Sequence, residues 1–477
     1  MEKWKTKWRD FVYAHDVRQL VPQTEPMGDV RAKEGGRVKA HKRAQEQRVY
    51  NLKTGLMDKK ERVLKDDFDK ILELSCRAAE CPLCLNADVY MGFCSYNCRY
   101  CFSLLHLESL MTAFYDAGDS GNVMRLRPAS TRRIKEQLIG YLNGRFKDGI
   151  QDAFNRRVPV RLGIRMEDFL PAEEKHQRSK LFLDILAEYD YPCMVNTKSD
   201  LFLKWPDLWR TLSECDVAVQ ESIIVTDDKQ AKLLEPGAPS SSRRFQVLKE
   251  MNESGIRAMA RIEPYMVGIN DNTIDEYVNM CLDANVPHVT TDTYSYFANS
   301  LGIRFNMLLH GFDYEWMFRA TSEYQEVGSL ALEKLFFKLQ DSGVGCSSFN
   351  FQSLPLNSRG VCCGVSETTF KTKSDYNYYN LLTAGYDLVK GGKKNQMSLG
   401  DFKSRYKPLA TSLTFDAEFT SVESAVDGVW NKKSFGPWSL DWIAGVKSIG
   451  QDEHGIVYEF DPDRVLEVHE RMELVMK

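Results

Sequence analysis

The sequence predicts an α/β fold built on a parallel barrel, complete or partial. Six strand-like apolar segments between residues 87 and 296 alternate with helical segments at spacings typical of right-handed βαβ crossovers. Polar residues follow several of these strands, and parallel barrels place their chemistry at the carboxyl ends of strands. Both observations indicate one barrel with a site on its rim.

The elements follow in order from local patterns. Helical stripes at i, i+4, i+7 and i+8 are expected around 134–142, 181–189, 240–255 and 274–282, with Ser240–Ser242 as an N-cap and Gly255 as a stop. A further helix is expected to close near 68–74, and 316–339 has helical patterning. The expected strands are 87–93, 158–164, 192–196, 217–225 around a polar centre, 257–266 and 288–296.

Composition bounds the class of protein. The 477 residues are 43% apolar and carry a net charge of −4, so two or three folded units are expected and no global field indicates nucleic acid. The N-terminus has no apolar signal core, and no apolar run is long enough to span a membrane. We therefore expect a cytoplasmic protein without a membrane partner, whose twelve cysteines are metal ligands or core residues.

The charge is concentrated at the N-terminus. Residues 1–60 hold 15 Lys or Arg and 8 Asp or Glu, a local net charge of +7. Such an arm can neutralise phosphates, which makes a nucleic acid a candidate partner. A solvated terminus without a partner is the alternative.

Three cysteines form the most specific motif of the chain. Cys94, Cys98 and Cys101 stand in a C-x3-C-x2-C spacing directly after the first predicted strand. Three thiolates leave one iron of a 4Fe–4S cluster without a protein ligand, whereas redox carriers usually supply four. A zinc site or a chance group of reduced thiols is the alternative, although zinc sites more often use two C-x2-C pairs.

Polar residues at three later strand ends accompany this loop. Glu167 with Asp168, Lys198 and Ser222 are all expected on the rim that carries the cysteines. Each of them could also belong to an ordinary rim salt bridge.

The loop Cys94–Phe102 resembles the signature of radical SAM enzymes. The segments Arg161–Asp168, Asn196–Lys198, Glu221–Ile223 and Leu234–Pro239 resemble, more narrowly, the spore photoproduct lyase-like branch. The resemblance covers about residues 86–300. It implies a partial (β/α)6 barrel, a 4Fe–4S cluster on the three cysteines and S-adenosylmethionine on the open iron. It also implies an external one-electron reductant of flavodoxin or ferredoxin type.

The resemblance also implies residue roles. Glu167 would lie near the methionine amino group or the ribose, Lys198 near the carboxylate, and Ser222 on the same ligand, while Tyr100 and Phe102 would border the adenine. Spore photoproduct lyases keep a hydrogen-donating cysteine where this chain has Arg165. The candidate catalytic residues are Arg165 and Tyr294, and lesion repair through that thiol is not expected. Cys193 and Cys215 are expected to be core thiols.

Cysteines outside the motif suggest a second metal site. An N-terminal pair with C-terminal partners could bind a second Fe–S cluster or zinc, and isolated reduced thiols are the alternative. The candidate ligands are Cys81, Cys84, Cys346, Cys362 and Cys363.

The expected organisation has four parts. Residues 1–85 form the basic arm, 86–300 the barrel, 301–400 an accessory region with cysteines in loops, and 401–477 a C-terminal extension with a closing helix. Three functions remain open: radical chemistry on a nucleobase or nucleic acid, radical chemistry on a peptide or small molecule, and a metal- or nucleic-acid-binding module without activity. The first is favoured over the second because of the branch resemblance and the basic arm, and the rim residues argue against the third.

Overall fold

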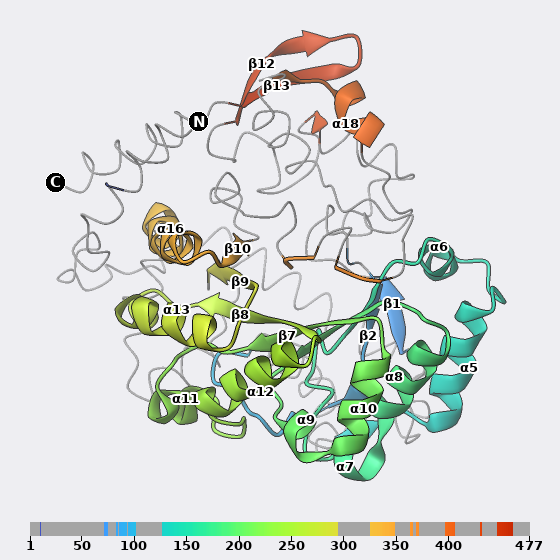
Figure 1. Cartoon of the computed structure of the whole chain (residues 1–477). Helices are drawn as coiled ribbons and strands as arrows, with labels where there is room; N and C mark the ends of the chain where they lie inside the picture. The colour runs from blue at the N-terminus through green and yellow to red at the C-terminus, as the bar shows by residue number, and fades with distance from the viewer. Residues whose placement is uncertain are drawn as a thin grey trace, which may run out of the picture.

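A computed structural model gives the fold of the chain (Figure 1). Its central part is continuous from residue 126 to residue 293. The described residues are 10, 71–74, 83, 85–92, 94–101, 126–293, 325–348, 363–365, 369–371, 396–405, 430–431 and 446–460.

The core of the fold is one sheet of eight strands in the order β1-β2-β5-β6-β7-β8-β9-β10. Strand β1 is antiparallel to β2, and all the other neighbours are parallel. Among the described residues no pairing joins β10 to β1, so the sheet is a partial barrel. The strands are β1 (Leu72–Leu74), β2 (Leu85–Ala87), β5 (Val160–Leu162), β6 (Cys193–Thr197), β7 (Val217–Ser222), β8 (Arg257–Tyr265), β9 (His288–Thr293) and β10 (Gly345–Ser348).

Helices connect successive parallel strands and cover one face of the sheet (Figure 1). The longer ones are α5 (Thr131–Leu142), α8 (Arg178–Glu188), α10 (Pro206–Glu214), α12 (Ser241–Glu253), α13 (Ile274–Asp283) and α16 (Gln325–Asp341). The shorter ones are α6 (Gly149–Asn155), α7 (Glu173–His176), α9 (Leu201–Lys204), α11 (Asp228–Leu234) and the 3-10 turn η2 (Asp271–Thr273). None of the described helices is long and apolar enough to cross a membrane.

The two faces of the sheet differ in chemistry. The face under the helices carries fully buried apolar side chains that the strand register places on one side: Ala87, Leu162, Val195, Val219, Ala258, Ala260 and Val289. Successive residues of a strand point to opposite faces. The other face, which we call the inner face, therefore carries Asn86, Arg161, Asn196, Gln220, Ser222, Arg261 and Thr290.

Five of the six parallel strands expected between residues 87 and 296 are confirmed as β5–β9, and helix α12 begins after Ser240 as predicted. The Ser240 hydroxyl accepts a hydrogen bond from the Arg243 backbone N–H at 3.3 Å, which satisfies one free donor of the helix start. Gly255 follows the helix with φ +82°, a left-handed conformation that favours glycine.

Three local predictions are wrong. Residues 72–74 form strand β1 rather than the end of a helix, because they pair with β2. The predicted strand 87–93 ends at Ala87, because the Asp168 carboxylate takes the backbone N–H groups of Val89 and Tyr90 at 3.1 and 3.3 Å. A short β3 (Tyr90–Met91) then pairs with β4 (Arg127–Pro128). Cys346 lies in strand β10 rather than in a loop.

A second, smaller sheet lies in the C-terminal region. Its strands are β11 (Gln396–Met397), β12 (Val446–Asp452) and β13 (Gly455–Phe460). Helix α18 (Leu399–Arg405) lies between β11 and β12 in the chain. The Trp430 indole is fully buried here and donates to the Ile456 carbonyl at 2.6 Å, while its ring stacks near Phe402. These contacts give the small sheet a core of its own.

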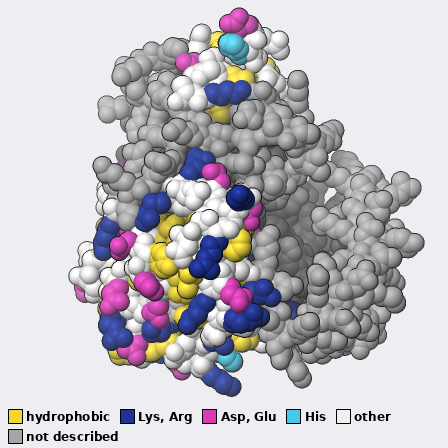
Figure 2. Space-filling view, turned by 90° about the vertical axis from the view of Figure 1, so that its right-hand side faces the viewer, with side chains coloured by type: hydrophobic (Ala, Val, Ile, Leu, Met, Phe, Trp, Pro, Cys, Tyr) yellow, Lys and Arg dark blue, Asp and Glu magenta, His cyan; other side chains and the backbone are white. Residues whose placement is uncertain are grey.

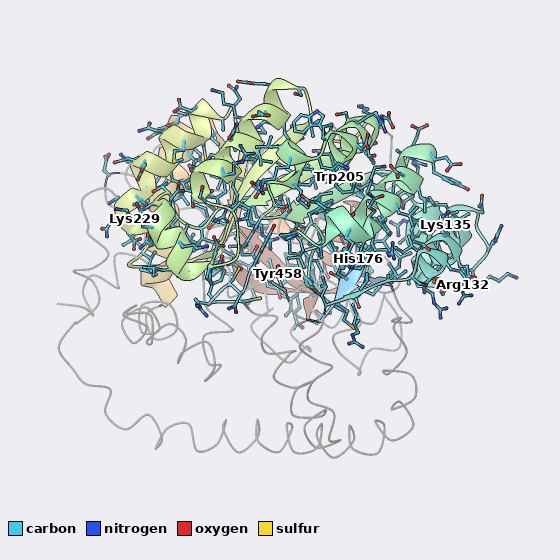
Figure 3. All side chains as sticks on the ribbon, turned by 90° about the horizontal axis from the view of Figure 1, so that it is seen from below. Arg132, Lys135, His176, Trp205, Lys229 and Tyr458 are labelled. Atoms are coloured by element: carbon cyan, nitrogen blue, oxygen red, sulfur yellow. The ribbon has the colours of Figure 1, made fainter. Side chains whose placement is uncertain are left out.

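The outer surface of the helices has no single sign of charge. Figure 2 shows Lys and Arg side chains interspersed with Asp and Glu over the described face. Seen from below, Arg132 and Lys135 of α5 extend outward at the edge of the helical layer (Figure 3). This surface therefore gives no indication of a nucleic-acid interface.

Candidate cysteine-loop site

The three motif cysteines lie on one compact loop that follows β3. Cys98 is buried, Cys94 and Cys101 are partly buried, and all three thiols are free. Two tight turns shape the loop, because Asn97 N donates to Cys94 O and Cys101 N donates to Cys98 O, both at 3.2 Å. Asn97 has φ +50°, which Asn tolerates better than most residues. Each thiol is close enough to the other two for their charges to interact.

The loop sits in an apolar environment. Burial raises the pKa of Cys94 to about 12 and raises the pKa of Cys98 well above its ordinary value. Without a metal, the thiols of Cys94 and Cys98 are therefore neutral. A metal or cluster that binds here must displace those protons.

Within the described residues, no group of three or more His, Cys, Asp or Glu side chains forms a site for a single metal ion. In a 4Fe–4S cube each thiolate binds a different iron, and three thiolates leave the fourth iron open. The other described cysteines (Cys193, Cys215, Cys281, Cys346 and Cys363) belong to the main core instead. The loop thus offers three ligands, which is the set that an open cluster needs.

The cysteine loop is docked on the segment 234–237 that follows α11. Arg99 N donates to Leu234 O at 2.8 Å, and Gly237 N donates to Tyr96 O at 3.0 Å. Gly237 lies so close to the loop that a Cβ there would stand 2.0 Å from the Ser95 carbonyl oxygen. Only glycine permits this approach.

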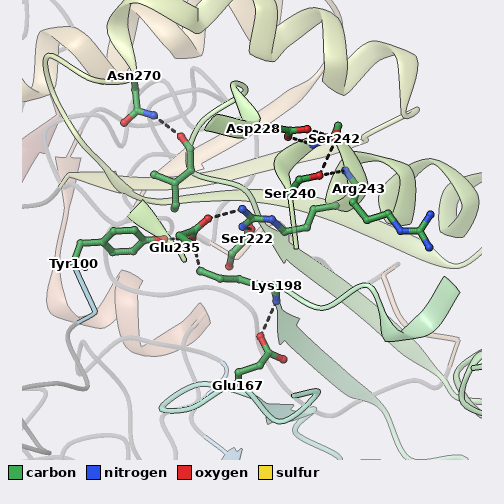
Figure 4. Close-up of polar contacts among 12 residues, drawn as sticks. Tyr100, Glu167, Lys198, Ser222, Asp228, Glu235, Ser240, Ser242, Arg243 and Asn270 are labelled. Atoms are coloured by element: carbon green, nitrogen blue, oxygen red, sulfur yellow. Dashed lines mark hydrogen bonds and ion pairs between the residues drawn. The ribbon is translucent and has the colours of Figure 1, made fainter. Parts of the chain in front are cut away.

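Glu235 is the centre of the contacts around the loop (Figure 4). Its carboxylate accepts hydrogen bonds from the Tyr100 hydroxyl and from Arg244, and Lys198 Nζ lies 3.7 Å from its Oε1. Glu235 and Arg244 are almost completely buried, at 1% and 0% side-chain exposure. Burial alone would raise the pKa of Glu235, but Arg244 and Lys198 outweigh it and hold that pKa below its ordinary value. The buried Glu235–Arg244 ion pair therefore anchors the loop through the hydroxyl of Tyr100.

Lys198 and Glu167 meet at the end of strand β6. The Glu167 carboxylate accepts from Lys198 N and Thr197 Oγ1, both at 2.7 Å, and from Phe169 N at 3.0 Å. Burial raises the pKa of Glu167, although these hydrogen bonds oppose the shift. The Lys198 ammonium is 5.9 Å from the centre of the Tyr100 ring. The segment after β5 and the residue after β6 thus place two predicted cofactor residues, Glu167 and Lys198, side by side near the cysteine loop.

Ser222 ends strand β7, and its carbonyl accepts from Arg244 Nη1 at 2.6 Å. The preceding Glu221 is fully buried, and neither of its carboxyl oxygens has a hydrogen-bond partner among the described residues. Burial raises its pKa well above the ordinary value, although Arg244 opposes the shift. The neutral acid is therefore the favoured form of Glu221.

Arg165 lies at the edge of this region. Its guanidinium forms an ion pair with Glu73 of β1, its backbone N donates to Asp88 Oδ1 at 3.3 Å, and its side chain is 49% exposed. The described contacts of Arg165 are thus structural ones at the β1–β2 edge, and its catalytic role stays a prediction.

The remaining predicted residues divide into two groups. Phe102, Tyr294, Cys81, Cys84 and Cys362 lie outside the described residues. Cys346 and Cys363 are buried in the main core, where Cys346 Sγ contacts Phe336 O at 3.8 Å and Cys363 O accepts from Gln220 at 3.0 Å. Cys193 and Cys215 are buried free thiols, as expected.

Sequence reasoning gave no role to Glu235, Gly237 or Arg244, which hold the loop in place. The available signal was the segment Leu234–Pro239, which we noted only as part of a resemblance. In this segment Glu235 is the buried counter-ion of Arg244, and Gly237, two residues later, allows the close approach of the backbone to the cysteine loop. Arg244 gave no separate signal, because an Arg in a helix is ordinarily a surface residue.

Comparisons with known proteins found distant relatives. No protein-family model matches the chain. An uncharacterized protein of Methanocaldococcus jannaschii, MJ0683, is 27% identical over 185 residues, which is 38% of this chain and 60% of that protein.

Several solved structures are similar in part. A spore photoproduct lyase complexed with dinucleoside spore photoproduct matches with a TM-score of 0.37 and 13% identity, over 50% of this chain and 63% of the other. Streptococcus suis SuiB bound to S-adenosylmethionine matches with a TM-score of 0.39 and 14% identity, over 64% and 57%. The cobalamin-dependent S-adenosylmethionine radical enzyme OxsB matches with a TM-score of 0.28 and 14% identity, over 49% and 30%.

The chain thus spans less than two thirds of each of these relatives. Likenesses of this degree do not assign a function by themselves. The functional conclusion therefore rests on the cysteine loop and its surroundings.

Proposed function

We propose that this protein is a radical SAM enzyme. The observation that carries the proposal is the cysteine loop, in which three free cysteines lie within eight residues on a loop bound to the buried Glu235–Arg244 pair, with no fourth described cysteine in the same apolar cluster. Three ligands leave one iron of a 4Fe–4S cluster open. Cys94, Cys98 and Cys101 would hold the cluster.

The surrounding residues suit the second cofactor, S-adenosylmethionine. Lys198 supplies an ammonium beside the loop for a carboxylate, and Glu167 supplies a buried carboxylate for an amino group. Tyr100 contributes an aromatic ring, although its hydroxyl is already bound to Glu235. When bound, the cluster supplies the electron that cleaves S-adenosylmethionine to methionine and a 5′-deoxyadenosyl radical, which abstracts hydrogen from the substrate. The protein orients the two ligands and excludes water.

The test is anaerobic reconstitution with iron and sulfide, followed by dithionite and S-adenosylmethionine. We expect about four irons per chain in the loop site and release of 5′-deoxyadenosine. Cys98→Ala should abolish the release. The matched control is Cys281→Ala, which removes a fully buried thiol of α13 in the main core. Unchanged release from Cys98→Ala, or release lost equally in both variants, would refute the proposal.

We further propose that the substrate is a nucleobase or nucleic acid, which is modified or repaired. The +7 charge of residues 1–60 supports this substrate class, because such an arm can hold phosphates while a base enters the barrel. The test is salt-dependent binding of DNA and RNA by the full chain and by a chain that lacks residues 1–60. Binding that is lost with the arm supports the proposal, and no binding at low salt would favour a peptide or small-molecule substrate instead.

A further inference from the structure

The guanidinium of Arg161, on the inner face of the sheet, forms no ion pair among the described residues. Arg161 lies on β5, opposite Asn86 of β2 in register, and is partly exposed. Its Nε donates to Asn86 Oδ1 at 3.0 Å. Among the described residues this is its only polar partner, so both terminal nitrogens of the guanidinium are available.

Two other charged residues of this face form ion pairs within the described residues. Arg261 of β8 forms its ion pair with Glu263, two positions along the same strand. Glu73, which lies opposite Asn86 on β1, forms its ion pair with Arg165. Arg161 differs from these two, because its guanidinium has no ion pair among the described residues.

Asn196 adds a second unused donor beside Arg161. Arg161 stands opposite Met194 on β6, so Asn196 is its diagonal neighbour on the same face. The Asn196 oxygen accepts from Arg261 Nη1 at 3.3 Å, and because guanidinium can only donate, this contact fixes the orientation of the amide. Its NH2 group then remains without an acceptor, although Asn196 is only 3% exposed.

A buried donor without an acceptor is rare in folded proteins, and a ligand is one way to satisfy it. We propose that Arg161 and Asn196 bind an oxyanion of the substrate, a carboxylate or a phosphate. The planar guanidinium, held at Nε by Asn86, offers a two-pronged donor set that matches either group. The Asn196 amide would supply a further hydrogen bond from the neighbouring strand.

This inference deepens the proposed function, since it describes how the substrate of the same barrel would be anchored. The position is consistent with that role. Asn196 lies on β6 one residue before its end, and Lys198 follows that strand on the rim beside the cysteine loop. Ser222 ends the next strand, β7, on the same inner face. The Asn196 amide therefore lies close to the rim that carries the predicted cofactor residues.

The experiment uses the full chain and two probes, inorganic phosphate and acetate. Binding is measured by line broadening of the 31P and 13C resonances at low ionic strength. We expect the wild type to bind one of the two anions, and Arg161→Gln to bind it at least about tenfold more weakly. Arg161→Lys, which keeps the charge but loses the fork, should fall between them. The control Arg132→Gln removes an exposed charge on the outer surface and should bind like the wild type.

The anion that binds identifies the source of the oxyanion, since phosphate points to a nucleotide and acetate to a carboxylate compound. Equal binding by wild type and Arg161→Gln, or binding of neither anion by the wild type, overturns the inference. These probes require no cluster. A chain that binds the anion through Arg161 but never releases 5′-deoxyadenosine would therefore refute only the proposed function.

Discussion

Replacing Gly237 with Ala tests whether the docking of the cysteine loop controls cluster binding. In the structure, a Cβ at Gly237 stands 2.0 Å from the Ser95 carbonyl oxygen and 2.8 Å from the Tyr96 Cα. Both atoms belong to the backbone of the loop, so no flexible side chain can move aside. The loop itself must shift.

The size of the shift follows from the same distances. An ordinary contact begins at 3.4 Å, so the oxygen and the new methyl group must separate by about 1.4 Å. A displacement of this size would break the hydrogen bond from Gly237 N to Tyr96 O, now 3.0 Å long, and strain the one from Arg99 N to Leu234 O. Overpacking of this kind typically costs about 1–3 kcal/mol. The cysteines move with the loop, so cluster loading should fall along with stability.

The assay counts iron and sulfide per chain after reconstitution and measures unfolding by urea. The control is Gly450→Ala in β12, where an added Cβ meets no atom within 4 Å. We expect Gly237→Ala to load much less cluster and to lose about 1–3 kcal/mol, while Gly450→Ala changes little. If Gly237→Ala loads iron and resists urea like the wild type, the loop is not held by this contact and our reasoning about the site is wrong.

Three further substitutions test the network around the loop. Glu235→Gln leaves the fully buried Arg244 without its carboxylate and should cost about 3–5 kcal/mol in urea unfolding, whereas Glu136→Gln in an exposed pair should cost less than about 1 kcal/mol. Glu167→Gln replaces one of the two accepting oxygens by a donor, so the Lys198 N–H or the Thr197 hydroxyl loses its acceptor. We expect the free energy of unfolding to fall by about 1–3 kcal/mol and S-adenosylmethionine to bind more weakly. Unchanged binding would contradict the idea that Glu167 positions Lys198 for this ligand. Burial, opposed by Arg165, raises the pKa of Asp88 from 3.8 to about 6, so the folded state binds the extra proton between these values and loses stability as pH rises through them. Asp88→Asn should remove this loss, and parallel stability curves of wild type and variant between pH 4 and pH 7 would exclude it.

The sequence was sufficient for strands β5–β9, because their signals are local. Apolar runs such as 193–195 and 217–219, followed by polar residues, became β6 and β7 with the expected boundaries to within a few residues. The N-cap at Ser240 and the stop at Gly255 were equally local. Spacing also identified the cysteine loop, since three ligands within eight residues need no long-range information.

Tertiary contacts decided the rest. The strand expected over 87–93 was interrupted by a carboxylate from residue 168, about eighty positions away. The stretch near residue 72 looked helical alone, but the open edge of the sheet pairs it as a strand. Glu235 and Arg244 are nine residues apart in a segment that reads as polar surface, and only the fold buries both. Such pairings have no periodic signature in the sequence.

The two arginines of the segment Arg161–Arg165 illustrate how the face of a strand decides function. Comparison with the resembling family drew attention to Arg165, because a thiol is replaced there. In the structure Arg165 lies past the end of β5 and pairs with Glu73, whereas Arg161 lies within β5 and on the inner face. A register shift of one residue would exchange Arg161 with the fully buried Leu162. Because β2 and β6 fix the register of β5 from both sides, the Arg161 guanidinium, which has no ion pair among the described residues, is held on the face where a substrate of the barrel would lie. The position of a charge along the sequence therefore says little about its role until the pairing of its strand is known.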